Sequence, residues 1–192
     1  MAGSKEEMGP IEFKMDAFKN DVMNTAGNPK TAKAVMLAFI DNNCGHCREY
    51  MREAFPKIRE EYIDKGKLIY IAKAFPLSSG TLGSEAAFCA GEQGKYWVML
   101  EKAMGASPKE DELEKISAGI GVNEAQFREC IKKHAYIKNI MDSKSYGSKV
   151  GVSGTPTFFI GPFNRDGKTI KAIRMVGYRS YDDFKKQIDS IN

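Results

Sequence analysis

Two apolar runs, at residues 34–40 and 67–73, are typical of buried strands on either side of a long helix. The run "AVMLAFI" (34–40) is apolar at every position, as in a central parallel strand that is covered on both faces. Residues 47–66 follow with apolar side chains at helical spacing and end at Gly66, a common helix stop. Pro56 lies inside this helix and should kink it rather than end it. Because "KLIYIAK" (67–73) resumes the strand pattern, we expect a parallel strand–helix–strand unit with a right-handed crossover.

Helical patterns dominate two other stretches of the chain. Residues 11–26 carry apolar side chains at helix-like spacing before "GNP", which predicts an N-terminal helix. From residue 76 to 145 strand signals are missing. The breaks in this stretch predict four helices near 82–92, 94–104, 108–118 and 123–145.

Strand patterns return near the end of the chain. "GTPTFFI" (154–160) and "KTIKAIRMVGY" (168–178) predict a hairpin whose turn contains "NRDGK". "SYDDFKKQIDSI" then predicts an amphipathic helix with Ser180 as its N-cap. The organisation expected is a discontinuous α/β domain, made of residues 11–75 plus 146–192. A helical domain (76–145) is inserted into it, and residues 1–10 are expected to be a tag or a disordered N-terminus.

Composition and charge exclude several classes of protein. The 192 residues include 29 Lys and Arg against 25 Asp and Glu, with no basic run interleaved with aromatic residues, so we expect no nucleic-acid partner. The longest apolar run, 34–40, is too short to span a bilayer. The opening "MAGSKEEMGP" lacks the features of a secretion signal and resembles a vector-derived remnant, so it leaves export open.

The closest pair among the four cysteines is Cys44 and Cys47, in "CGHC" between the first strand and the helix. A zinc site would need Cys89 and Cys130 as further ligands in a chain with two histidines, and we expect no metal or other cofactor. An inert bridge is a second alternative, but its four-residue ring is strained and gains little loop entropy. A working redox pair is the interpretation that the sequence favours.

The helix start should make Cys44 the more acidic of the two thiols. Unpaired amides and the positive end of the helix dipole meet there, and His46 is close enough to stabilise the same sulfur. Cys47, one turn further on, should be more shielded. A pKa lowered from about 8.5 to about 5 would stabilise the reduced form by roughly 2.7 kcal/mol at pH 7, about 60 mV in potential. Gly45 and His46 between the cysteines therefore favour a relatively oxidising pair.

Three segments resemble the DsbA-type thiol–disulfide oxidoreductases of bacteria. "AVMLAFIDNNCGHCREYM" resembles their active-site segment, and "FPLSSGTLGSEAAFCAGEQGKYWVMLEKAM" resembles the strand exit and first inserted helices. "VGVSGTPTFFIG" is similar to their cis-proline loop, and the resemblance covers roughly residues 28–190. It implies an α/β protein with a thioredoxin fold, an inserted all-helical domain and an N-terminal helical extension.

The resemblance also implies roles for individual residues. Cys44 corresponds to the exposed nucleophile, His46 to its electrostatic stabiliser and Cys47 to the buried partner. Thr155 and Pro156 correspond to the loop that binds the backbone of an extended substrate, with a cis bond before Pro156.

Other positions of the chain depart from the family pattern or leave a choice open. Many members bury a carboxylate six residues before the first cysteine, where this chain has Ala38. The nearest acid is Asp41, which we expect to be more exposed. Cys89 and Cys130 are either buried free thiols or a disulfide within the inserted domain. Because an oxidase of this type works in an oxidising compartment, we expect the disulfide.

These expectations define a function and its alternatives. We expect a monomeric enzyme that donates the Cys44–Cys47 disulfide to unfolded or reduced proteins and is re-oxidised by a membrane, quinone-linked DsbB-like partner. Its compartment should be the periplasm or another exported location, its signal peptide being absent from this sequence. The alternatives are a disulfide isomerase or reductase of the same fold, or a non-catalytic thioredoxin-like chaperone or metal-binding module.

Overall fold

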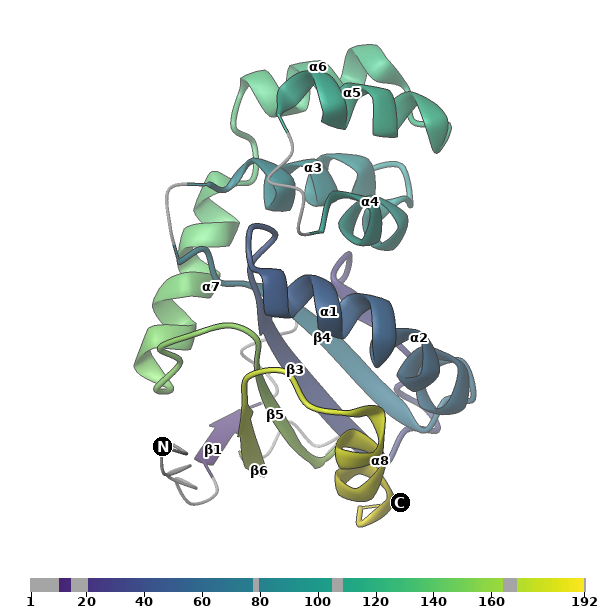
Figure 1. The fold of residues 1–192 in the computed structure, drawn as a ribbon, viewed down its shortest axis with the longest axis vertical. Helices are drawn as coiled ribbons and strands as arrows, with labels where there is room; N and C mark the ends of the chain where they lie inside the picture. Colours follow the sequence, from purple (N-terminus) through teal and green to yellow (C-terminus); the bar gives the residue numbers. More distant parts are fainter. Residues whose placement is uncertain (1–10, 15–20, 78–79, 105–108, 164–168, 192) are drawn as a thin grey trace.

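One mixed sheet of six strands lies at the centre of the part that the computed structural model describes, residues 11–14, 21–77, 80–104, 109–163 and 169–191 (Figure 1). Its order is β1-β6-β5-β3-β4-β2. β3 is parallel to β4 and antiparallel to β5, and β5 is antiparallel to β6. Both the predicted crossover unit and the predicted strand pairing near the C-terminus are therefore confirmed, although the turn "NRDGK" lies outside the described residues. The strands are β1 (Ile11–Lys14), β2 (Thr25–Ala26), β3 (Ala34–Ile40), β4 (Leu68–Ala74), β5 (Thr157–Pro162) and β6 (Thr169–Val176).

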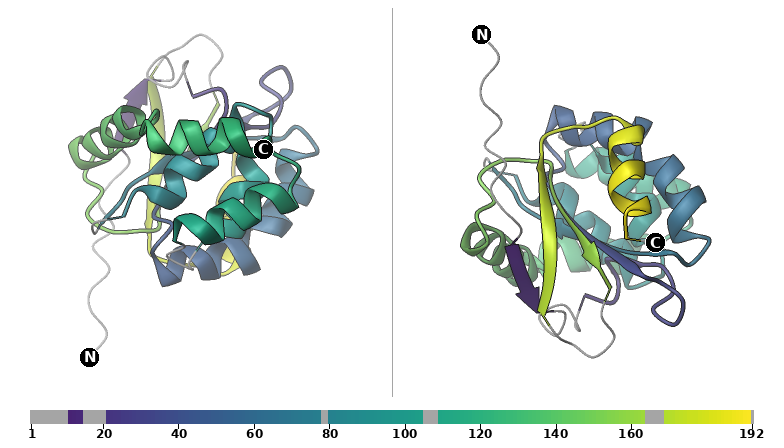
Figure 2. Two further views of the ribbon diagram at one scale, coloured as in Figure 1. Left: turned by 90° about the horizontal axis from the view of Figure 1, so that it is seen from above. Right: turned by 90° about the horizontal axis from the view of Figure 1, so that it is seen from below.

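Helices cover both faces of this sheet (Figure 2). On one face, α1 and α8 pack on β5 through Tyr50, Phe158 and Phe184, whose ring centroids lie 4.6–5.4 Å apart. On the other face α7 approaches closely, because a Cβ atom at Gly147 would lie 2.7 Å from Cδ2 of Phe75. The helical elements are α1 (Gly45–Glu53), α2 (Phe55–Ile58), the π-helical turn η2 (Arg59–Ile63), α3 (Leu82–Gly91), α4 (Tyr96–Ala103), α5 (Glu110–Gly119), α6 (Glu124–Lys132), α7 (Ile137–Lys149) and α8 (Tyr181–Asp189).

Helices α3–α6 of the insertion lie beyond one end of the sheet, and a disulfide connects two of them (Figure 1). Cys89 of α3 and Cys130 of α6 are bonded, with their Cα atoms 5.8 Å apart, so the expected bridge is present. The prediction of a single helix over residues 123–145 is wrong, because α6 ends at Lys132 and α7 begins at Ile137. His134 lies at the break: its backbone is left-handed, with φ 48°, and its Nδ1 lies 2.9 Å from the carboxylate of the buried Glu85.

The predicted N-terminal helix is also wrong where the structure describes it. Ile11–Lys14 is an edge strand antiparallel to β6, with Ile11 opposite Ala172, and Thr25–Ala26 pairs with β4. Ile11 also packs against the core on the α7 side of the sheet. Pairing with a distant strand edge therefore overrides the helix-like spacing of residues 11–26, of which 15–20 lie outside the described part.

Pro56 divides the long helix at the point where the sequence predicts a kink. α1 ends at Glu53, and Pro56 lies in the first turn of α2. A proline is tolerated there because the first-turn N–H groups have no partner within a helix. The chain nevertheless continues in helical form, since the N–H of Ile58 donates to the carbonyl of Ala54.

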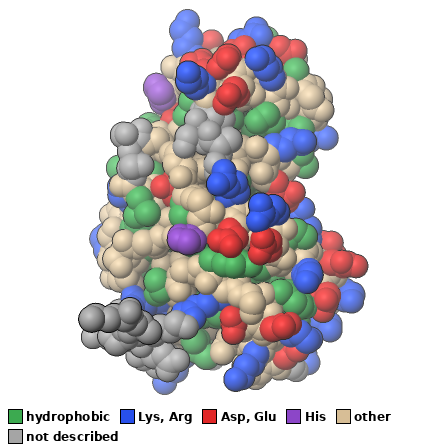
Figure 3. Space-filling model, in the orientation of Figure 1, with side chains coloured by type: hydrophobic (Ala, Val, Ile, Leu, Met, Phe, Trp, Pro, Cys, Tyr) green, Lys and Arg blue, Asp and Glu red, His purple; other side chains and the backbone are tan. Residues whose placement is uncertain are grey.

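Charged side chains of both signs are interspersed over the face of the molecule in Figure 3, as the mild net charge predicts. Over the described residues, no helix combines the length and the apolar character that crossing a bilayer requires.

The final helix α8 begins at the predicted N-cap, where the Ser180 hydroxyl accepts from the N–H of Asp183.

Candidate active site

Cys44 is the N-cap residue of α1, at the point where the chain leaves β3. Its backbone is extended, with φ −89° and ψ 121°, and its Sγ accepts a hydrogen bond from the backbone N–H of Cys47 at 3.4 Å. A sulfur in this position receives the unpaired amide hydrogens of the first helical turn and the positive end of the helix dipole. The expected location of Cys44 at the helix start is therefore confirmed.

The surroundings of the two thiols move their pKa values in opposite directions. The pKa of Cys44 falls from its ordinary value to about 5, chiefly because the Cys47 thiol donates a hydrogen bond to the Cys44 thiolate, and partial burial opposes this fall. The Thr155 hydroxyl and the backbone amides of Cys47 and His46 lower it further. The pKa of Cys47 is strongly raised, by that same hydrogen bond and by burial. The pair can therefore hold one proton on Cys47 and one negative charge on Cys44 at neutral pH.

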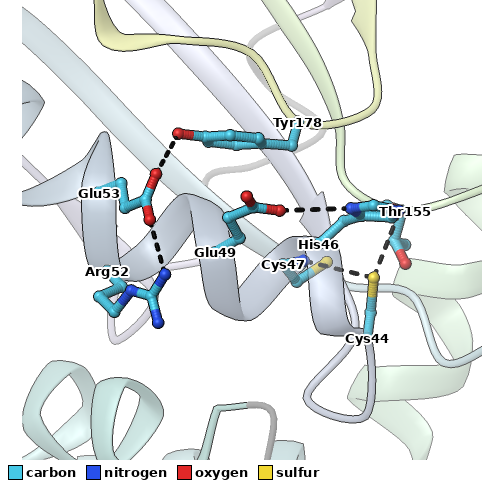
Figure 4. Close-up of polar contacts among 8 residues, drawn as sticks. All are labelled: Cys44, His46, Cys47, Glu49, Arg52, Glu53, Thr155 and Tyr178. Atoms are coloured by element: carbon cyan, nitrogen blue, oxygen red, sulfur yellow. Dashed lines mark hydrogen bonds and ion pairs between the residues drawn. The ribbon is translucent and has the colours of Figure 1, made fainter.

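The Thr155–Pro156 loop lies directly against Cys44 (Figure 4). In its protonated state the Cys44 thiol donates to the carbonyl oxygen of Thr155 at 3.3 Å, and the peptide bond that follows is cis. The Thr155 hydroxyl is buried and has no hydrogen-bond partner among the described residues while Cys44 is protonated. It is therefore free to donate to Cys44 once that sulfur is a thiolate, which is how it lowers the pKa. The N–H of Gly177 donates to the carbonyl of Pro156 at 2.8 Å, which fixes the loop to the end of β6. The loop expected from the sequence and the cysteine pair thus lie together.

Gly45 and His46, the residues between the cysteines, face solvent. No atom lies within 4 Å of the position that a Cβ atom would take at Gly45. The side chain of His46 is 74% exposed, and its Nδ1 lies 3.5 Å from Oε2 of Glu49. The direct contribution of His46 to the thiolate comes from its backbone amide. Sequence reasoning missed Glu49, which the i, i+3 spacing on a helix could have indicated.

Asp41 differs from its expected environment. The residue is 3% exposed, which corrects the expectation of a more exposed acid. Its backbone N–H lies 3.5 Å from the Sγ of Cys47, and its two carboxylate oxygens accept from the N–H groups of Asn43 and Leu77 at 2.9 and 3.0 Å. Ala38, at the position where members of the fold often bury an acid, is fully buried in the same core cluster as Cys47. The acid near this pair therefore comes from the end of β3 and is held by backbone amides.

The remaining cysteines and histidine belong to the insertion. Cys89 and Cys130 are bonded to each other, and His134 faces Glu85 rather than the redox pair. No group of three or more His, Cys, Asp or Glu side chains that could hold a metal ion is found in the described part of the chain.

Comparisons with known proteins agree with this geometry. Alpha-DsbA1 from Wolbachia pipientis superimposes with a TM-score of 0.76 at 29% identity, covering 88% of this chain and 89% of that one. The thiol–disulfide exchange protein alpha-DsbA2 from the same organism has a TM-score of 0.71 at 23% identity, covering 93% and 94%. Disulfide bond formation protein D of Bacillus subtilis is 23% identical over 82% of this chain and 72% of its own length. The family model Thioredoxin_4, described as thioredoxin, matches residues 19–190, and the chain therefore belongs to this thioredoxin family.

Proposed function

We propose that this chain donates a disulfide from Cys44–Cys47 to proteins that are still folding. The enzyme class, a DsbA-like thiol–disulfide oxidoreductase, is supported by the relatives and by the fold. The observation that carries the direction of electron flow is the thiolate-stabilising environment of Cys44, a helix N-cap whose pKa is lowered to about 5. A pair whose reduced form is stabilised in this way accepts electrons readily and is therefore oxidising.

The proposed reaction consists of two exchanges. A substrate thiolate attacks Sγ of Cys44 in the oxidised pair, the Cys44–Cys47 bond breaks, and a mixed disulfide forms. The electron pair of the broken bond passes to Cys47, which takes up a proton because its burial raises its pKa. A second substrate thiolate then attacks the substrate sulfur of the mixed disulfide and releases Cys44 as a stabilised thiolate. Two substrate thiols are oxidised to one disulfide, and the enzyme disulfide is reduced to a dithiol.

The Thr155–Pro156 loop is the proposed binding site for the substrate backbone. The Thr155 carbonyl oxygen lies 3.3 Å from Sγ of Cys44 and accepts the thiol hydrogen in the dithiol form. The oxidised pair has no thiol hydrogen, so the same carbonyl is available to a backbone N–H of an extended substrate. This placement would bring a substrate cysteine next to the sulfur that it attacks, with Gly45 and His46 at the rim.

The cell compartment and the redox partner belong to the same proposal. An oxidising dithiol and a disulfide between Cys89 and Cys130 both suit the periplasm or another exported location. The reduced enzyme needs an oxidant for each cycle, for which we propose a membrane, quinone-linked protein of the DsbB type. The insertion (76–145) and the discontinuous thioredoxin-like domain (11–75 with 146–192) are proposed to act as one monomeric enzyme.

The test is the reduction potential of the pair, together with the activity of single-cysteine variants. Equilibration with glutathione should give a potential near that of strong disulfide donors, about −120 mV, rather than about −270 mV as in thioredoxin-like reductants. Cys44→Ser should abolish the oxidation of a reduced dithiol protein, whereas Cys47→Ser should accumulate a mixed disulfide through Cys44. A potential in the reductant range would overturn the proposal.

An isomerase is distinguished from a donor by the substrate that it converts. The donor proposed here should oxidise reduced ribonuclease faster than it reshuffles scrambled ribonuclease. The reverse order of rates would assign the chain to the isomerases.

A further inference from the structure

Every polar group of Asp41 takes part in holding the segment between β3 and α1. Its N–H donates to the Sγ of Cys47 at 3.5 Å, and its carbonyl oxygen accepts from the N–H of Cys44 at 3.0 Å. Its carboxylate accepts from the N–H of Asn43 within the same turn and from the N–H of Leu77, which lies 36 residues further along the chain. One buried residue therefore contacts both cysteines through its backbone, and its carboxylate bonds the same turn to the segment that leads from β4 into the helical insertion.

Asn42 and Asn43 connect the same two segments. The Ser84 hydroxyl donates to Oδ1 of Asn42 at 2.8 Å, and Nδ2 of Asn43 donates to the carbonyl of Gly80 at 3.1 Å. Asn42 is 2% exposed, and a Cβ atom at Gly83 would lie only 2.8 Å from its Cβ. The turn before the cysteines is thus bonded to the start of the insertion at residues 77, 80 and 84, and the two lie side by side in Figure 1.

The geometry of this turn determines what Cys44 can do. A helix N-cap stabilises an anion only when its own backbone is extended and its side chain points at the first-turn amides. The bond from Cys44 N–H to the carbonyl of Asp41 fixes Cys44 in that conformation, and the carboxylate of Asp41 fixes the turn. A side chain that accepts from the N–H two residues ahead is a common way to stabilise such a turn.

We propose that Asp41 is a positioning residue for the redox pair: its buried carboxylate holds the turn that places Cys44 as the N-cap of α1 and bonds this turn to the segment entering the insertion. The inference rests on the proposed function, since it assigns a cause to the acidity of Cys44. It also gives a role to a buried acid only three residues before Cys44, where a negative charge alone would oppose a thiolate.

The direction in which the acidity of Cys44 changes when Asp41 is replaced separates positioning from a simple charge effect. If Asp41 acts through its charge, then Asp41→Asn and Asp41→Ala should both make Cys44 more acidic, because a nearby negative charge is removed. If Asp41 positions the turn, both variants should make Cys44 less acidic. Asparagine keeps one acceptor oxygen and presents an N–H₂ group to the second amide, so its effect should be smaller than that of alanine.

The experiment measures Cys44 acidity by thiolate absorbance at 240 nm and the reduction potential in glutathione buffers. For Asp41→Ala we expect about a tenfold loss of Cys44 acidity and about a tenfold shift of the exchange equilibrium, equivalent to about 30 mV toward reducing. Asp41→Asn should lie between this variant and the unmodified protein. Asp142→Asn is the matched control, because Asp142 is an acid on α7 that is 65% exposed and paired with Lys138, and its loss should change neither quantity.

Thermal unfolding of both redox forms distinguishes positioning from a purely structural role. Positioning predicts that Asp41→Asn destabilises the reduced form more than the oxidised form. Equal destabilisation with unchanged acidity and potential would overturn the inference, as would an increase in acidity or the failure of both variants to fold in either redox form. If the unmodified protein itself lacked an acidic thiol, the proposed function would fail first, so the two failures are distinguishable.

Discussion

His46 lies between the cysteines with its ring 3.5 Å from Glu49, so its influence on Cys44 should be modest. An exposed imidazole is screened by water, and the pKa of Cys44 is lowered mainly by Cys47, Thr155 and backbone amides. We predict that His46→Leu makes the pair more reducing by about 10–30 mV, to be measured in glutathione buffer. His134→Gln is the control, because the other histidine of the chain faces Glu85 in the insertion and glutamine keeps a hydrogen-bond donor for this buried carboxylate. A change of less than about 10 mV would assign the acidity of Cys44 to the Cys47 thiol, the Thr155 hydroxyl and the backbone amides alone.

The environments of single residues could be predicted from the sequence where neighbouring residues determine them. The position of Cys44 at a helix start follows from neighbouring residues, so its role as N-cap and the shielding of Cys47 could be expected. The burial of Asp41 depends on the N–H of Leu77, which only the folded chain brings near. The contact between His46 and Glu49 is also local, because residues three apart lie on the same face of a helix, and it was predictable from the sequence.

At the scale of elements, continuous apolar runs predicted the strands correctly, whereas helix-like spacing of apolar residues did not always predict a helix. β3 and β4 are buried at every position, as their apolar runs predict for central strands that are covered on both faces. Residues 11–14 have a pattern that fits either a helix or an edge strand, and the distant edge of β6 decides between them. The break between α6 and α7 contains neither glycine nor proline, so local sequence does not indicate it. His134 adopts the left-handed conformation there, with its ring against a buried carboxylate on α3.

The disulfide between α3 and α6 gives a prediction for the insertion. Cys89 and Cys130 are 41 positions apart, a loop for which the chain-entropy model gives up to about 4 kcal/mol of stabilisation. Replacing both by Ala should therefore lower the melting temperature by on the order of 10 °C, as measured by circular dichroism. The single variant Cys89→Ala provides the comparison, since it removes the bond but leaves the Cys130 thiol in place. An unchanged melting temperature in both variants would mean that helix packing alone holds the insertion.

Over the whole molecule, the redox state of two sulfurs is coupled to global stability. The thiolate of Cys44 is stabilised only in the folded reduced protein, because the amides of α1, the Cys47 thiol and the Thr155 loop come from segments that the fold brings together. An unfolded chain holds the same thiol at its ordinary pKa. The oxidised protein has no titrating group at this position, so the two redox forms should differ in stability in a manner that depends on pH.

The pH dependence has a definite sign. Because folding lowers the pKa of Cys44 from 9.0 to about 5, its contribution is complete above the ordinary pKa, decreases as the pH falls, and is lost below about 5. After allowance for solvent screening, we predict that the Cys44 thiolate makes the free energy of unfolding of the reduced form about 2 kcal/mol larger than that of the oxidised form at pH 7. This contribution should disappear near pH 5. Urea unfolding of both forms between pH 4.5 and 8, in steps of about half a unit, measures the stability difference. The reduced Cys44→Ser variant should lack the pH-dependent part. A stability difference between the redox forms that stays constant over this range would show that the thiolate of Cys44 is not what makes the reduced state favourable.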